Sequence, residues 1–86
     1  MEPVTDKPVL ALFPNPARQQ LSLYVANYDK QKMIEIYTIN GQRVLQLTEM
    51  SNSLNLDVSK LKAGVYVLRV RGTDGTLVSQ EKFVKE

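Results

Sequence analysis

Apolar and polar residues alternate along most of this chain, with the two-residue period of β-strands that bury one face. Leu21, Leu23 and Val25, for example, alternate with less apolar residues. Residues 64–71 are rich in β-branched and aromatic side chains, which favour strands. No segment has the spacing of an amphipathic helix. These patterns predict strands at residues 9–13, 21–26, 32–39, 43–47, 54–58, 64–71 and 77–84.

Turn-forming residues separate the predicted strands at intervals of roughly 8–12 residues, which is typical of β-sandwiches. Pro14 and Pro16 lack a backbone N–H and are expected to end the first strand. The pairs at 40–41 (Asn-Gly) and 74–75 (Asp-Gly) are typical of hairpin turns. We therefore expect an all-β fold, an Ig-like antiparallel β-sandwich of about seven strands.

The segment before the sixth predicted strand resembles a single capped turn. Ser59 is placed to accept a hydrogen bond from a nearby N–H, and Gly64 to take a positive φ. In the strand that follows, Tyr66 is expected in the core with Leu68 and Val70.

The first eight residues differ in composition from the rest of the chain. Residues 1–8 hold two prolines and three charged side chains, and they lack the apolar stretch of a secretory signal peptide. We interpret residues 1–8 as a linker from an upstream part of a longer protein and residues 9–86 as one domain.

Composition removes several kinds of chemistry. The chain has no histidine and no cysteine, which excludes Ser-His-Asp and Cys-His catalysis and disulfides. Its 11 basic and 9 acidic residues are scattered, so no basic stripe for nucleic acid forms in the sequence. No apolar run approaches the roughly 18–20 residues of a membrane span. No glycine-rich phosphate loop occurs. We expect no enzymatic activity, no cofactor and no metal.

The carboxylates are the remaining candidates for chemistry. A pair of them serves in glycoside hydrolysis, but these lie at polar strand positions or in turns, where we expect solvent to surround them. Calcium binding at Asp74 is the other alternative, although a lone Asp-Gly is more often a turn. The residues considered are Glu35, Glu49, Asp57, Asp74 and Glu81.

Four short motifs occur in a fixed order. They are FPNPA at 13–17, IY at 36–37 with GQRV at 41–44, LDVS at 56–59 with Leu61 and GVYV at 64–67, and KFVK at 82–85. Each alone has a plain structural explanation as a strand breaker, a hairpin or a core segment. Together they resemble type A C-terminal sorting domains of proteins exported by the type IX (Por) secretion system of Bacteroidota. The motif positions are Pro14, Asn15, Pro16, Gly41, Ser59 and Leu61.

The resemblance implies an export signal. Such a domain passes through the periplasm, is recognised by the outer-membrane translocon, and delivers its passenger to the cell surface or the medium. In many members a sortase-like peptidase cuts upstream of the domain and attaches the passenger to lipopolysaccharide. The linker at residues 1–8 lies where that cut would fall.

We expect recognition to use the last hairpin, because the family match is densest there. An exposed edge strand at its end can accept a strand from a partner, or from a second copy in a homodimer. The expected recognition residues are Gly64, Val65, Tyr66, Val67, Arg69, Arg71, Lys82, Phe83, Val84 and Lys85.

Two other functions stay open at this point. An extracellular adhesion or carbohydrate-binding module has the same fold class, but sugar sites usually present exposed aromatic platforms. The chain has no tryptophan, and its four tyrosines do not cluster in the sequence. An intracellular interaction domain is disfavoured only by the family resemblance.

Overall fold

The computed structural model describes residues 7–86. It contains seven strands and, within these residues, no helix. Nothing in that range forms a helix long and apolar enough to span a membrane. The strands are β1 (Val9–Phe13), β2 (Gln20–Ala26), β3 (Lys32–Thr38), β4 (Arg43–Glu49), β5 (Ser53–Asp57), β6 (Gly64–Gly72) and β7 (Leu77–Lys85).

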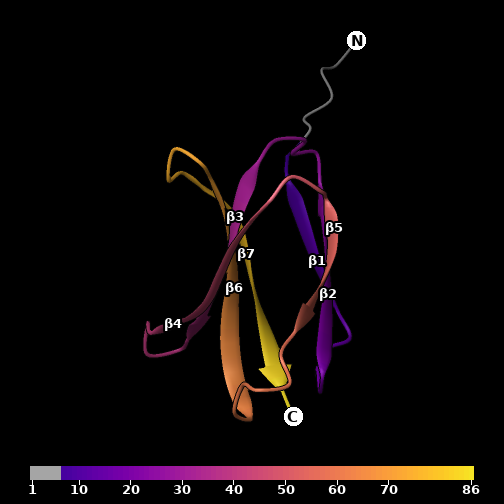
Figure 1. Ribbon diagram of the computed structural model, residues 1–86, viewed down its shortest axis with the longest axis vertical. Coiled ribbons are helices and arrows are strands. Elements are labelled where there is room, and N and C mark those ends of the chain that lie inside the picture. The colour runs from indigo at the N-terminus through magenta and orange to yellow at the C-terminus, as the bar shows by residue number, and fades with distance from the viewer. Residues whose placement is uncertain (1–6) are drawn as a thin grey trace.

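The strands form two antiparallel sheets packed face to face (Figure 1). One sheet has the order β1-β2-β5 and the other β4-β3-β6-β7. The β2–β3, β4–β5 and β5–β6 connections pass from one sheet to the other, as in Ig-like domains. The predicted antiparallel sandwich is confirmed. Several strands extend one or two residues beyond the predicted ends, because backbone pairing continues through polar residues there. The strands predicted at 32–39 and 54–58 end one residue earlier, at Thr38 and Asp57.

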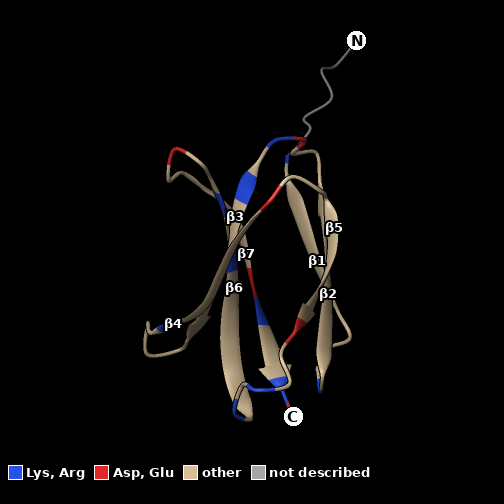
Figure 2. Cartoon of the chain, in the orientation of Figure 1, with Lys and Arg blue, Asp and Glu red and all other residues tan. Residues whose placement is uncertain are grey.

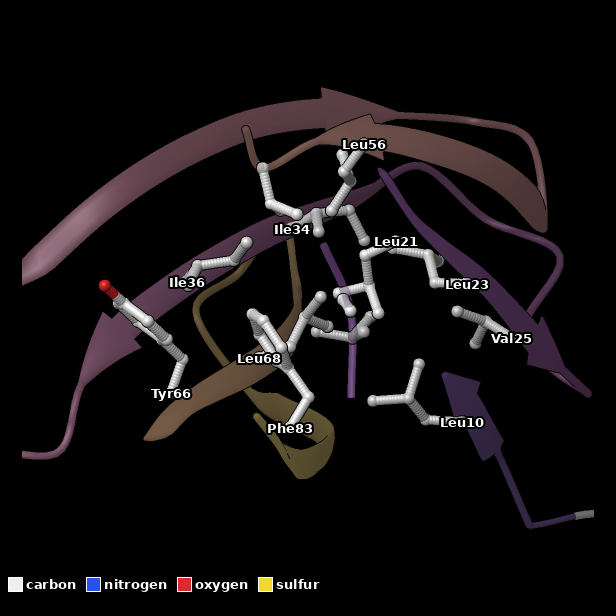
Figure 3. Close-up of a cluster of buried hydrophobic side chains, with 13 residues drawn as sticks. Leu10, Leu21, Leu23, Val25, Ile34, Ile36, Leu56, Tyr66, Leu68 and Phe83 are labelled. Atoms are coloured by element: carbon white, nitrogen blue, oxygen red, sulfur yellow. The ribbon is translucent and has the colours of Figure 1, made fainter. Parts of the chain in front are cut away.

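The core lies between the sheets and comes from one face of each strand (Figure 3). Leu21, Leu23 and Val25 of β2 face Ile34 and Ile36 of β3 across the sandwich, and all five are almost fully buried. Burial at every second position is what the alternation in the sequence predicts. The buried hydrophobic cluster is Leu10, Ala17, Leu21, Leu23, Val25, Ile34, Ile36, Leu56, Val58, Tyr66, Leu68, Val70 and Phe83.

Two hairpins of the larger sheet use the same turn. The N–H of Gly41 donates to the Thr38 carbonyl at 2.9 Å, and the N–H of Gly75 donates to the Gly72 carbonyl at 2.9 Å. Both loop glycines have a positive φ, 91° at Gly41 and 89° at Gly75. A type I turn followed by a left-handed residue gives this geometry, and glycine adopts it without strain. The two predicted hairpins are therefore confirmed.

The connection between β5 and β6 also follows the prediction, with one difference. Gly64 has a φ of 154°. Ser59, however, does not act as the acceptor: Asp57 Oδ1 accepts bonds from the Ser59 N–H at 2.9 Å and from its hydroxyl at 2.6 Å. These bonds lower the pKa of the Asp57 carboxyl. The carboxylate preceding the serine therefore organises the turn, because it is the stronger acceptor.

Candidate functional site

The β6–β7 hairpin carries the residues expected to take part in recognition, and it divides them between two faces. Tyr66 and Phe83 are directly opposite each other and point into the core. Their rings stack with centroids 5.6 Å apart and planes at 20°. Lys85 is also buried, with 7% of its surface exposed. Tyr66, as predicted, lies in the core with its neighbours on β6.

Tyr66 also fixes the start of β6. Its hydroxyl donates to the carbonyl of Lys62 at 2.6 Å, four residues upstream. Tyrosine corners of Ig-like domains make this contact at the equivalent bend. The motif containing Gly64 and Tyr66 is therefore explained by the bend and the core, and a direct contact with a partner is not needed to account for it.

The remaining recognition residues lie on the other side of the hairpin. Alternation places them on the outer face of the larger sheet, away from the core. Lys82 lies opposite Val67, and Val84 lies opposite Val65. We call this side the outer face. Its recognition residues are Val65, Val67, Arg69, Arg71, Lys82 and Val84, and Gly64 begins β6 beside them.

The proline motif at residues 14–17 lies against the end of β7, and we call this segment the strap. The N–H of Ala17 donates to the Val84 carbonyl, and the N–H of Glu86 donates to the Ala17 carbonyl, both at 2.8 Å. The Asn15 side-chain oxygen accepts from the N–H of Val84 at 2.9 Å. Pro14 and Pro16 flank Asn15, and the peptide bonds preceding both prolines are cis.

The strap changes the prediction of an exposed C-terminal edge. β7 is an edge strand, as expected. At Val84, however, the strap uses both backbone groups that point outward. Since strand residues alternate, the outward backbone groups of Gln80 and Lys82 lie further along the same edge. Only this shorter stretch is open to an added strand.

Glu35 lies at the centre of the outer face and is almost fully buried, with 2% of its surface exposed. The expectation that solvent surrounds this carboxylate is wrong. Oε1 accepts from the Tyr37 hydroxyl at 2.8 Å and from Arg71 Nε at 2.9 Å. Oε2 accepts from Arg43 Nη1 at 3.4 Å. Three donors on β3, β4 and β6 replace the water that a free carboxylate would bind.

These contacts set the charge state of Glu35. Burial favours the neutral acid, but the bonds from Tyr37 and Arg71 and the charges of Arg71 and Arg43 outweigh it and lower the pKa of Glu35 below its ordinary 4.5. The same pair raises the pKa of Arg71, chiefly through its bond to Glu35. The carboxylate therefore stays ionised and holds both guanidinium groups.

We expect this carboxylate to steepen the acid denaturation of the domain. A group whose pKa is lower in the folded state stabilises the fold above its unfolded pKa and loses that contribution as pH falls through the folded value. For Glu35 the loss occurs below about pH 4.5. The difference in the free energy of unfolding between pH 7 and pH 3, measured in urea, should be smaller in Glu35→Gln than in the natural chain.

The variant Tyr37→Phe is the graded control for this experiment. It removes one donor to Glu35 and keeps the ring. Its pH dependence should lie between those of the natural chain and Glu35→Gln. An unchanged dependence in Glu35→Gln would show that other carboxylates account for the acid transition.

Arg69 is also held in place on the outer face. Its guanidinium carbon lies 4.7 Å from the centre of the Tyr37 ring. Its Nε donates to the Gln80 side chain at 3.1 Å. A shallow groove of about 320 Å³ runs beside it, lined by Val67, Arg69, Gln80, Glu81 and Lys82. Figure 2 shows basic positions on β6, on β7 and at the start of β4.

The other motif residues lie outside this face. Gly41 is at the tip of the β3–β4 hairpin. Ser59 and Leu61 belong to the β5–β6 connection, where the Leu61 N–H donates to the Val58 carbonyl at 3.0 Å and its side chain packs on the core. Their roles in the fold are visible, and they do not contact the outer face.

Sequence reasoning missed Lys32, which is fully buried. Its ammonium donates to the carbonyls of Met50 and Ser51 and to the Asn52 side chain, at 3.1, 3.3 and 2.9 Å. Burial lowers the pKa of Lys32, and the charges of Asp29 and Glu49 oppose that shift. The sequence did contain a signal for this burial. Lys32 lies two residues before Ile34 and four before Ile36, so its side chain points to the same, core-facing side of β3.

The site lacks the geometry of a metal centre or a sugar platform. Residues 7–86 bring together no group of three or more carboxylate side chains that could hold a metal ion. Tyr66 is in the core, Tyr28 packs against the core, and Tyr37 lies under Arg69. Tyr24, with 47% of its surface exposed, is on the other sheet.

Comparison with known proteins identifies the family. The family described as "Secretion system C-terminal sorting domain" matches residues 11–86. No curated protein matches the chain. Among solved structures, dimeric latent PorU from Porphyromonas gingivalis matches with a TM-score of 0.62 and 20% identity. The match covers 95% of this chain and 9% of the PorU chain, and at this identity it supports the fold alone.

The family match covers all seven strands apart from the first two residues of β1, and it includes the four ordered motifs. The chain therefore belongs to the secretion system C-terminal sorting domain family, and it is a sorting signal of the type IX secretion system.

Proposed function

We propose that the folded domain is read by the outer-membrane translocon of the type IX system while its cargo is in the periplasm. A sortase-like peptidase then cuts the linker at residues 1–8 and attaches the cargo to lipopolysaccharide. The domain itself has no catalytic role in this scheme. Most of the predicted linker, residues 1–6, lies outside the described residues, so the cleavage step remains a prediction.

The observation that carries the proposal is the position of the β6–β7 hairpin and the strap relative to the start of the domain. Ala17 of the strap pairs with Lys85, so the end of β7 lies near the end of β1. The start of β1 is at the opposite end of the sandwich (Figure 1). A peptidase acting before Val9 would therefore work a full strand length from the end of β7, and both parts could be engaged at once.

Deletion of residues 81–86 tests the proposal. The deletion removes Phe83 from the core and Val84, the residue of β7 to which the strap is hydrogen-bonded. A reporter that carries the truncated domain should accumulate in the periplasm, with surface display reduced to background. Fractionation and protease accessibility of intact cells measure the outcome, and the same reporter with the full chain is the control. Normal display of the truncated form would contradict the proposal.

A homodimer through the β7 edge also remains a prediction. The strap occupies part of that edge, so a second copy would have to pair along the stretch that includes Gln80 and Lys82.

A further inference from the structure

The outer face of the larger sheet concentrates positive charge. Arg43, Arg69, Arg71 and Lys82 share it with one carboxylate, Glu35. Four cations and one anion give the face a charge of +3, whereas the whole chain carries +2. The rest of the chain is therefore slightly negative. Glu81 of β7 has the opposite parity and lies across from Leu68, although it also lines the groove beside Arg69 and Lys82.

The single carboxylate of the face is already fully engaged. Both oxygens of Glu35 accept hydrogen bonds, and the side chain is buried. It orders Arg71 and Arg43 without occupying all of their N–H donors. Arg71 uses Nε for Glu35 and Nη1 for the Gly75 carbonyl. The guanidinium groups are thus held in position while some of their N–H donors stay without a partner among the described residues.

Preordering lowers the cost of binding. Arg69 is fixed by the Tyr37 ring and by Gln80, and it donates to Gln80 only through Nε. Its two terminal nitrogens remain for a partner. An arginine side chain that is already ordered loses less conformational entropy when it binds, and its planar fork suits carboxylates.

An apolar strip borders the cations. Val65 and Val84 are opposite each other, with 41% and 39% of their surfaces exposed, and Val67 is next to them on β6. The groove lined by Val67, Arg69, Gln80, Glu81 and Lys82 joins the strip to the basic part of the face. Protein interfaces combine an apolar centre with a polar rim and are enriched in arginine. A phosphate-rich surface would use the cations and leave the valines without a partner.

We propose that the outer face is the surface by which the domain binds an acidic protein surface, with carboxylates opposite Arg69 and Lys82 and an apolar contact on the valine strip. This inference rests on the proposed function, and it names the chemistry of the partner. It also places the contact on the face of the sheet, whereas the sequence suggested the edge of β7.

Binding to poly-L-glutamate tests the charge preference of the face. The double variant Arg69→Gln/Lys82→Gln should bind roughly tenfold more weakly at low salt, and the affinity of the natural chain should fall as salt is added. The matched control Lys60→Gln/Lys62→Gln removes the same charge from exposed positions in the β5–β6 connection. It should change binding less than about twofold, since these lysines lie outside the face. Thermal unfolding confirms that each variant is folded.

Three results would overturn the inference. Equal weakening by both double variants would show that only net charge matters. If the natural chain does not bind polyglutamate, the proposal that the outer face binds an acidic protein surface is wrong. Binding to phosphatidylglycerol vesicles without binding to polyglutamate would assign the face to phosphate groups.

Export of the reporter separates this inference from the proposed function. If the 81–86 deletion blocks display and Arg69→Gln/Lys82→Gln reduces it severalfold, both stand. If the deletion blocks display and the double variant exports normally, the sorting function stands and the docking face is wrong. If the deletion exports normally, the proposed function fails whatever the double variant does.

Discussion

Phe83→Ala is expected to lower the free energy of unfolding by about 3–5 kcal/mol. The ring is 1% exposed and stacks on Tyr66 across the β6–β7 pair. Its removal costs the transfer free energy of the ring and leaves a cavity that the surrounding strands fill only in part. A domain of this size has a total stability of about 5–15 kcal/mol, so a single substitution would remove roughly a fifth or more of it.

Phe13→Ala is the matched control for this substitution. Phe13 is the only other phenylalanine, and 53% of its surface is exposed. Its loss should cost less than about 1 kcal/mol, because little area returns to water. Urea unfolding of the three proteins gives the comparison. Similar losses for both substitutions would mean that the stacked pair does not anchor the last strand.

Lys32→Ala is expected to lower stability by about 2–4 kcal/mol, an unusual effect for removing a lysine. The buried stem leaves a cavity, and the carbonyls of Met50 and Ser51 and the side chain of Asn52 lose the ammonium donor. These acceptors belong to the β4–β5 connection, so the ammonium ties β3 to the segment that passes between the sheets.

Lys32→Met separates the two contributions. Methionine keeps most of the apolar stem and lacks the donor, so we expect a loss of about 1–3 kcal/mol from the unpaired acceptors. Lys82→Met, at an exposed position of β7, should change stability by less than about 0.5 kcal/mol. If Lys32→Met is as stable as the natural chain, the cost of burying the ammonium offsets its three hydrogen bonds.

The local features of this fold could be predicted from the sequence. Alternation, a short apolar run at residues 9–13 and the β-branched and aromatic residues of 64–71 identified the seven strands, and the glycines at 41 and 75 identified both hairpin turns. These features depend on residues that are close together in the chain. The strand ends were less accurate, because backbone pairing does not stop where the apolar pattern stops.

The features that the sequence did not predict depend on distant residues. Glu35 was expected in solvent because carboxylates are rarely buried without partners. Its partners Arg43 and Arg71 come from β4 and β6, and only the pairing of those strands with β3 brings them to it. The strap was recognised as a strand breaker, but its bond from Asn15 to Val84 of β7 joins residues 69 positions apart. No local pattern contains such a contact.

The strap has a consequence for the time at which the domain becomes complete during synthesis. Asn15 is made before its partner Val84, which lies 69 residues later in the chain. Contacts of such high sequence separation cannot form until the later segment exists. A chain whose synthesis stops before Val84 therefore lacks the closed sandwich. A secretion system that reads the closed form would export chains that contain the closed strap and leave shorter ones behind.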